Sequence, residues 1–177
     1  MTRGNVIVRR AEENDLPRMA KINARVFLGD RDHPSGALEW MTCSFRAFPQ
    51  YQYFVIETDG MVAGYAGWQM HGGFHRAEPA VELDQIGIDP DFQGKRLGPK
   101  LTEESTRDVI AWMQGVNTRI ESHITLIVWA NGLNFNALSI YAEVFTEGLR
   151  GFRMQFGDRG EVMLRVRIPM VRKVRPH

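Results

Sequence analysis

The stretch from Glu82 to Gly98, ELDQIGIDPDFQGKRLG, constrains the fold of this chain more than any other. An apolar β-type segment ends at Asp89-Pro90, and a basic turn between two glycines then leads into a long helical pattern. A strand, a turn and a helix N-terminus in this order present backbone N–H groups that have no intrahelical partner. We therefore expect a site for a phosphate-bearing ligand at residues 93–98.

Composition limits the class of protein. A length of 177 residues predicts a single domain, residues 1–177, in which residues 170–177 form a basic, solvated tail. A net charge of +1 gives no reason to expect a nucleic-acid or membrane partner. The single cysteine, Cys43, excludes an internal disulfide and is expected to be a buried structural thiol. Since no signal peptide or membrane-length apolar run occurs, we expect a cytoplasmic protein.

Hydrophobic periodicity predicts the order of the secondary structure. Strands are expected at residues 5–9, 53–58, 61–70, 80–88, 124–130, 152–156 and 161–168. Helices are expected to begin near Asn14 or Asp15, at Ser35, near Lys95 and at Asn134. This order predicts an α/β fold with one mixed sheet and helices on both faces.

Glycines give two local predictions. Asp59-Gly60 between two strands is a strong hairpin signal. The strand that follows this turn contains Gly64 and Gly67, which indicate a bulge or a surface that another backbone or a ligand approaches closely.

The sequence QGKRLG at 93–98, preceded by LDQIGIDP and followed by a long helix, resembles the acetyl-CoA-binding motif of the GNAT superfamily of N-acetyltransferases. The family pattern is Gln/Arg-x-x-Gly-x-Gly/Ala. Gln93 and Gly98 match its ends, and Arg96 stands where a glycine is usual. Because the element order also matches, the resemblance covers nearly the whole chain. It implies a GNAT-like fold, with a mostly antiparallel sheet in which the fourth and fifth strands are splayed.

The resemblance also implies acetyl-CoA (coenzyme A) as a cosubstrate. Backbone amides of the turn would bind its diphosphate: Gln93, Gly94, Lys95, Arg96, Leu97 and Gly98. Lys95 and Arg96 add cationic side chains, and the backbone of Ile86, Gly87 and Ile88 would pair with the pantetheine arm. The later stretch NFNALSIY is similar to the family's Asn-x-x-Ala-x-x-x-Tyr, so Asn134 and Ala137 are further candidate contacts. Asn131 is an alternative to Asn134.

Acyl transfer needs a base for the ammonium group and an acid for the leaving thiolate. Glu82 lies eleven residues before Gln93, which is the spacing of the glutamate base in family members that use one. Asp84 faces the same side of the strand, so it is an accessory or alternative base. Tyr141 falls at the position of the family's tyrosine acid, and a phenol is a suitable proton donor to a thiolate.

We therefore expect an N-acetyltransferase that moves an acetyl group from acetyl-CoA to a primary amine by direct attack in a ternary complex. The alternatives are a non-catalytic acyl-CoA-binding regulatory module and an acyltransferase for a longer acyl group. The acceptor can be a small amine, an antibiotic, an amino acid or a protein N-terminus, and a homodimer stays open. Residues expected to line the acceptor pocket are Asp30, Asp32, Trp68, His71 and Phe156. No metal is expected, because Gly72-Gly73 separates His71 from His75.

Overall fold

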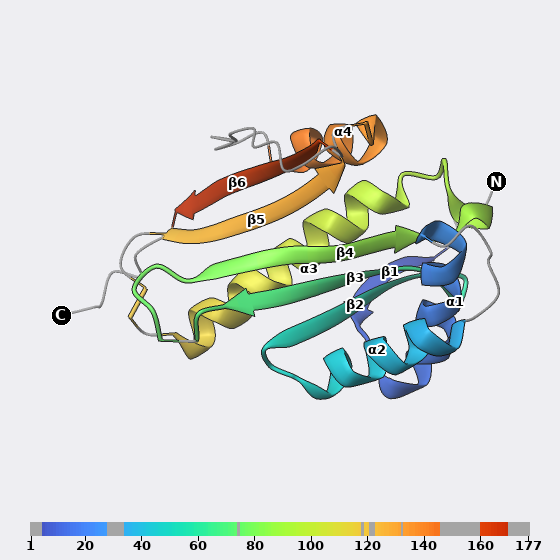
Figure 1. Ribbon diagram of the computed structural model, residues 1–177, viewed down its shortest axis with the longest axis horizontal. Coiled ribbons are helices and arrows are strands. Elements are labelled where there is room, and N and C mark those ends of the chain that lie inside the picture. Colours follow the sequence, from blue (N-terminus) through green and yellow to red (C-terminus); the bar gives the residue numbers. More distant parts are fainter. Residues whose placement is uncertain are drawn as a thin grey trace.

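The structure is a computed structural model that describes residues 5–27, 34–73, 75–117, 119–120, 123–131, 133–145 and 160–169. Its six strands lie in sequence order: β1 (Val6–Arg10), β2 (Tyr51–Thr58), β3 (Met61–His71), β4 (Ala80–Ile88), β5 (His123–Asn131) and β6 (Glu161–Pro169) (Figure 1). Neighbouring strands are antiparallel except β4 and β5, which are parallel. The predicted mixed, mostly antiparallel sheet is confirmed.

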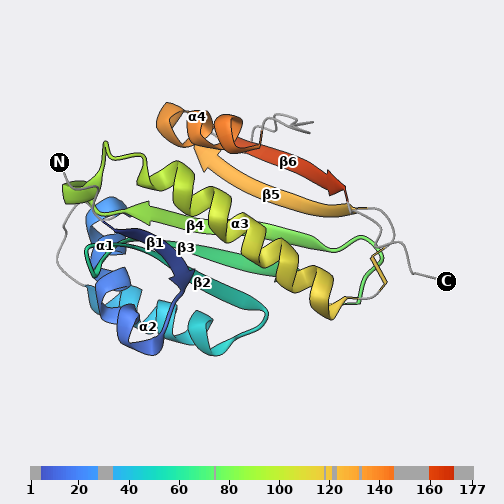
Figure 2. The same cartoon turned by 180° about the vertical axis from the view of Figure 1, so that it is seen from behind.

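Helices cover both faces of this sheet, as predicted. On one face lie α1 (Leu16–Phe27), which follows the short 3-10 helix η1 (Glu13–Asp15), and α2 (Pro34–Arg46). On the other lie α3 (Leu97–Val116), which follows the 3-10 helix η2 (Pro90–Phe92), and α4 (Phe135–Val144) (Figure 2). Alternation along β2 serves both layers, since Phe54 and Ile56 pack in the α3 core while Tyr53 and Val55 pack against α1 and α2.

Two sequence features produce the parts of the fold that matter most for the site. The turn between β2 and β3 consists of Asp59 and Gly60, both with positive φ, so the predicted tight hairpin is confirmed. In α3 the apolar residues Leu97, Leu101, Val109 and Met113 are buried against the sheet. This apolar stripe holds the first turn of α3 beside the end of β4.

Three expectations are wrong, each for a physical reason. Ser35 does not begin α2, because Pro34 already occupies a helical position and its fixed φ suits a first turn. Cys43 is exposed on α2 rather than buried, because Met41 takes the core position. Trp68 does not line an acceptor pocket, since it is fully buried against α3 and donates a 3.0 Å hydrogen bond to Ser105.

The predicted strand at 152–156, the basic tail at 170–177 and the acceptor residues Asp30, Asp32 and Phe156 lie outside the described residues.

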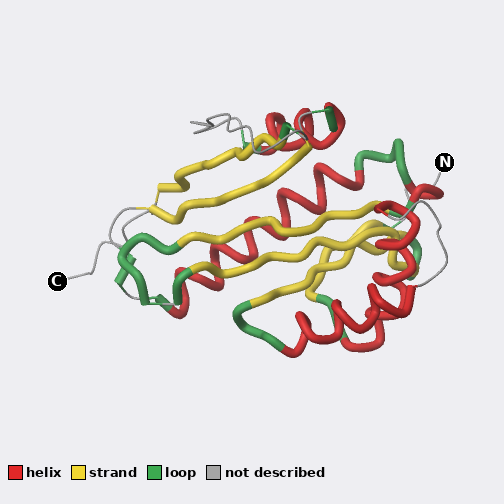
Figure 3. Tube along the Cα trace, in the orientation of Figure 1, coloured by secondary structure: helices red, strands yellow, loops and turns green. Residues whose placement is uncertain are grey.

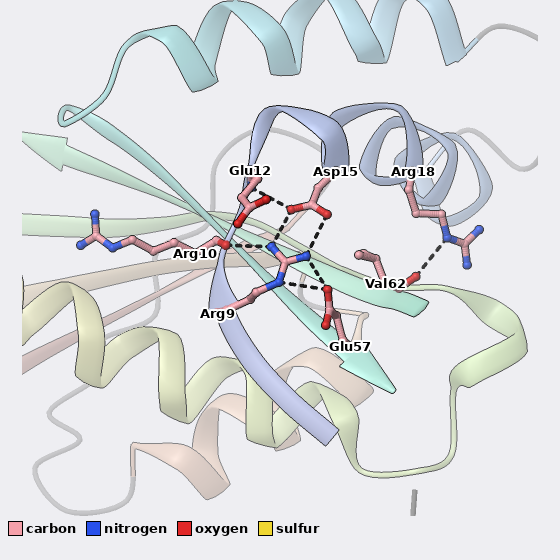
Figure 4. A network of polar contacts seen from close by, with 7 residues as sticks. All are labelled: Arg9, Arg10, Glu12, Asp15, Arg18, Glu57 and Val62. Carbon is pink, nitrogen blue, oxygen red and sulfur yellow. Dashed lines mark hydrogen bonds and ion pairs between the residues drawn. The ribbon is translucent and has the colours of Figure 1, made fainter. Parts of the chain in front are cut away.

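A polar network fixes the N-terminal strand to its neighbours (Figure 4). The guanidinium of Arg9 in β1 donates hydrogen bonds to both carboxylate oxygens of Asp15, at 2.7 and 3.0 Å, and to Glu57 in β2. Burial alone would raise the pKa of Asp15, but hydrogen bonds from Arg9 and from the Glu12 N–H outweigh it and lower that pKa. Asp15 thus takes part in the capping box at the start of η1 and also ties η1 to the sheet.

Candidate active site

The strands β4 and β5 separate at their carboxyl ends. Their pairing runs from Ala80–Thr125 to Leu83–Val128, whereas β4 continues to Ile88 and β5 to Asn131 (Figures 1 and 3). The predicted splay is thus confirmed. Among the described residues, the edge of β4 that faces β5 has no strand partner beyond Leu83, so its backbone groups can pair with an extended ligand.

The turn from β4 into α3 has the backbone of an anion site. Gly94 has a φ of 76° and Arg96 a φ of 57°, so two residues within three positions are left-handed. Arg96 is the N-cap residue of α3, and its side chain makes no capping hydrogen bond. The first amides of α3 therefore need another acceptor. The Gln93 side chain points back and donates to the Ile88 carbonyl at 3.1 Å.

A cleft of about 490 Å³ lies between the free part of β4, this turn and α4. It brings together the predicted cofactor residues apart from Lys95: Ile86, Gly87, Ile88, Gln93, Gly94, Arg96, Leu97, Gly98, Asn134 and Ala137. The candidate acid, Tyr141, lines the same cleft. Residues from three separate segments of the sequence thus meet at one cavity.

The two basic side chains of the turn each have a partner within the protein. The Lys95 ammonium lies over the Phe92 ring, 4.9 Å from its centroid. Arg96 forms an ion pair with Glu143 of α4, and both side chains are largely exposed. The Arg96 pair spans from the turn to α4, beside the cleft that both elements line.

The side chain of Tyr141 belongs to the buried core on the α3 side of the sheet. The residue is 4% exposed, and burial raises the pKa of its hydroxyl to about 12. Helix α4, which carries it, begins as predicted, because the Asn134 side chain accepts a 3.1 Å hydrogen bond from the Ala137 N–H. Asn131 instead accepts from the Leu133 N–H and does not line the cleft.

The two candidate bases lie on the opposite face of the sheet. Val81 and Leu83 pack in the α3 core, so Glu82 between them faces the α1–α2 side, where its carboxylate lies 2.6 Å from His71 Nε2. Asp84 accepts a 2.6 Å hydrogen bond from the Tyr51 hydroxyl. The two carboxylates share a face, as expected, but each has its own partner.

A β-bulge explains why Asp84 stands out. Gly67 pairs with Gln85 and Trp68 with Leu83, so Asp84 is the extra residue of β4. The bulge occurs beside Gly67, where the sequence predicted either a bulge or a close approach. Close approach also holds at Gly64, because a Cβ there would lie 2.4 Å from the Ile88 side chain.

Sequence reasoning missed how α1 contributes to the site. Arg18 and Arg25 of α1 form ion pairs of 2.7 and 2.5 Å with Asp89, whose side chain is fully buried. Asp89 also accepts a 3.0 Å hydrogen bond from the Asp91 N–H and so caps η2. The arginines are spaced at two helical turns, but nothing in the sequence connects them with a turn more than sixty residues away.

In the described part of the chain, no helix is both long and apolar enough to cross a membrane. Within the same residues, no group of three or more histidine, cysteine or carboxylate side chains is placed to hold a metal ion.

The splayed sheet, the left-handed turn and the cleft define a class of protein that can hold an extended, phosphate-bearing ligand between two strands. Comparison with known proteins agrees, since residues 16–141 match the acetyltransferase (GNAT) family. The chain belongs to this family.

One curated relative, the N-alpha-acetyltransferase RimI of Mycobacterium tuberculosis, is 33% identical over 91 residues, which are 51% of this chain and 53% of the relative. The chain therefore matches about half the length of that protein. Among solved structures, the ribosomal-protein-S18-alanine N-acetyltransferase from Escherichia coli aligns with a TM-score of 0.68 at 19% identity, over 98% of this chain and 100% of that chain.

A structure from Salmonella typhimurium that contains its cofactor acetyl-CoA aligns with a TM-score of 0.62 at 20% identity, over 97% of this chain and 98% of that chain. These structural likenesses establish the fold.

Proposed function

We propose that this protein transfers an acetyl group from acetyl-CoA to a primary amine by direct attack in a ternary complex. The observation that carries the proposal is the meeting of three elements at one cleft: the free edge of β4, the turn at 93–98 and the side chain of Tyr141. The family match and the cofactor bound to a structural neighbour support it.

The residues of the cleft fit acetyl-CoA. The amides at 93–98 would hold the diphosphate, aided by the helix dipole of α3, which contributes about 0.3–1 kcal/mol per exposed charge. The backbone of Ile86, Gly87 and Ile88 would hold the pantetheine arm. A Cβ at Gly98 would lie 3.2 Å from Ile140 Cδ1, so glycine leaves the floor of the cleft uncrowded. Asn134 and Ala137 would border the bound arm.

The proposed base and the proposed acid lie on opposite faces of the sheet. In the proposed reaction the amine nitrogen attacks the acetyl carbon and the C–S bond breaks. Glu82, or Asp84 as the alternative, accepts the proton that the ammonium loses. Tyr141 gives its hydroxyl proton to the departing sulfur, and the second proton that the nitrogen loses as the amide forms restores the Tyr141 hydroxyl. Burial raises the pKa of Tyr141 to about 12, so the hydroxyl keeps its proton until the sulfur departs.

Two relatives suggest where to look for the acceptor. The names of the M. tuberculosis and E. coli proteins describe acetylation of an α-amino group and of an alanine of a ribosomal protein. Peptides with a free N-terminus therefore belong in the first acceptor panel, beside polyamines, amino acids and aminoglycosides.

The function is tested by measuring free thiol release from acetyl-CoA with this panel. Turnover with at least one amine is expected. Acetyl-CoA binding without turnover on any amine would instead favour a non-catalytic regulatory module. Preference for a longer acyl-CoA in competition would favour an acyltransferase for a longer acyl group.

Tyr141→Phe tests the acid. Turnover should fall about 100-fold, because proton donation to the leaving group contributes rate at this scale, while acetyl-CoA affinity stays nearly intact. The measurement is kcat beside a calorimetric dissociation constant for acetyl-CoA. Unchanged kcat would reject the role of Tyr141.

A further inference from the structure

The bulge in β4 places two consecutive side chains on the α1–α2 face, and tyrosines hold both. Gln85 accepts a 3.2 Å hydrogen bond from the Tyr65 hydroxyl, which in turn accepts one of 2.6 Å from Asn23 of α1. Asp84 accepts the 2.6 Å bond from Tyr51. The orientation of both β4 side chains is therefore fixed before any ligand arrives.

Asp84 lies where the strands part. The last β4–β5 pair is Leu83–Val128, and Asp84 is the next residue of β4. One face of the strand beyond it lines the cleft, while a Cβ at Gly87 would lie 3.2 Å from the Tyr65 ring on the other face. A single strand thus separates the cleft from the tyrosine cluster, and an acceptor coming from the α1–α2 side meets Asp84 at the fork.

The carboxylate of Asp84 differs from the other carboxylates of this region. Asp89 pairs with two arginines, Asp15 with Arg9 and Glu82 with His71. Asp84 is exposed, and within the part of the chain that the structure describes it has no cationic partner. Its Oδ2 is held by a hydroxyl, and Oδ1 is left for another donor.

A group of aromatic rings lies next to this carboxylate, beginning with its partner Tyr51. Tyr51 is 7% exposed and lies 4.8 Å from the Tyr53 ring, centroid to centroid. Trp40 of α2 meets Tyr51 edge-on at 6.5 Å and is 44% exposed. A carboxylate beside aromatic rings is an arrangement that binds organic cations, since the charge pairs with the carboxylate and the attached carbons pack on the rings.

We propose that Asp84 binds the acceptor in its ammonium form, as the residue that selects a protonated primary amine, and that Tyr51 is a positioning residue acting through Asp84. The assignment rests on the proposed acetyl transfer and gives Asp84 a role distinct from that of a base. Glu82 then keeps the proton-accepting role.

Kinetics separate binding from proton transfer. Using the best amine of the panel, Asp84→Asn should raise KM for the amine at least tenfold and change kcat less than twofold. Asp84→Glu should restore part of the loss. Tyr51→Phe should raise the same KM, and its effect should not add to that of Asp84→Asn, because both act through one carboxylate.

Two comparison variants complete the series. Glu82→Gln should lower kcat with little change in KM. Asp108→Asn, which neutralises an exposed carboxylate on α3, should change neither. Unchanged KM in Asp84→Asn, or a loss of kcat together with the acidic limb of the pH–rate profile, would overturn the assignment.

A binding measurement keeps the test independent of turnover. Butylammonium is titrated by calorimetry into the protein saturated with coenzyme A, with butan-1-ol as the neutral match. The wild type should bind the cation in preference to the alcohol, and Asp84→Asn should lose that preference. Equal binding to both proteins would reject the ammonium site even if acetyl transfer is found. A preference that Asp84→Asn abolishes would uphold the site even if no amine is acetylated.

Discussion

At the scale of single residues, Arg96 shows where this chain departs from its family and what the departure costs. It occupies a position at which the family pattern has glycine, and its φ of 57° is the conformation that glycine adopts without strain. A non-glycine residue held there costs about 1–2 kcal/mol. Its side chain forms an ion pair with Glu143, but an exposed ion pair contributes little to the free energy of unfolding.

A pair of substitutions at this position tests the strain. Arg96→Gly should raise the free energy of unfolding relative to Arg96→Ala by about 1 kcal/mol, because only glycine relieves the left-handed backbone while both lose the ion pair. Chemical denaturation of the two variants gives the difference. The opposite order, in which alanine is the more stable, is the normal one for a right-handed helical position and would show that the turn is unstrained.

At this scale, the sequence predicted the positions of those residues whose place depends on local backbone conformation. Gly94, Gly98 and Asn134 take their predicted turn, cleft and cap positions, because each needs a local conformation that the residue type favours. The directions of the Trp68 and Lys95 side chains were not predicted. The direction of a side chain depends on what packs beside it, and neither Ser105 nor the Phe92 ring can be placed from the sequence.

At the scale of elements, α1 and the turn after β4 form one unit through Asp89. Its buried carboxylate meets two arginines of α1 and caps η2, while Val26 of the same helix lines the cleft. The position of the turn at 93–98 therefore depends on a helix that precedes it by three strands. Helix and strand order followed from periodicity, but this long-range contact had no local signal.

Asp89→Asn isolates the charge from the cap, since an asparagine oxygen can still accept the Asp91 N–H. It should lower the free energy of unfolding by about 3 kcal/mol, because it leaves two arginines without their buried partner. It should also weaken acetyl-CoA binding by loosening the turn. Asp91→Asn is the matched control at an exposed carboxylate on the same cluster and should change both quantities little. Equal effects of the two substitutions would contradict the role of Asp89 in joining α1 to this turn.

At the scale of the whole molecule, the candidate acid and the candidate bases lie on opposite faces of the sheet, near the point where β4 and β5 separate. The cleft with Tyr141 lies on the α3–α4 side, and Glu82 and Asp84 face the α1–α2 side. The resemblance predicted the splay and the members of both groups. The face on which each group lies could not be derived from the two-residue period of a strand. The bulge at Asp84 shifts that period by one residue, so the parts of β4 before and after it do not follow one alternation.

The central claim is that this cleft binds acetyl-CoA, and calorimetric titration tests it most directly. The wild type should bind one acetyl-CoA per chain. Ala137→Trp, which fills the cleft from α4, should abolish binding, whereas Ala142→Trp on the exposed side of the same helix should bind normally. Thermal unfolding of both variants controls for folding. Absence of wild-type binding at millimolar acetyl-CoA, or unchanged binding by a folded Ala137→Trp protein, would contradict the claim.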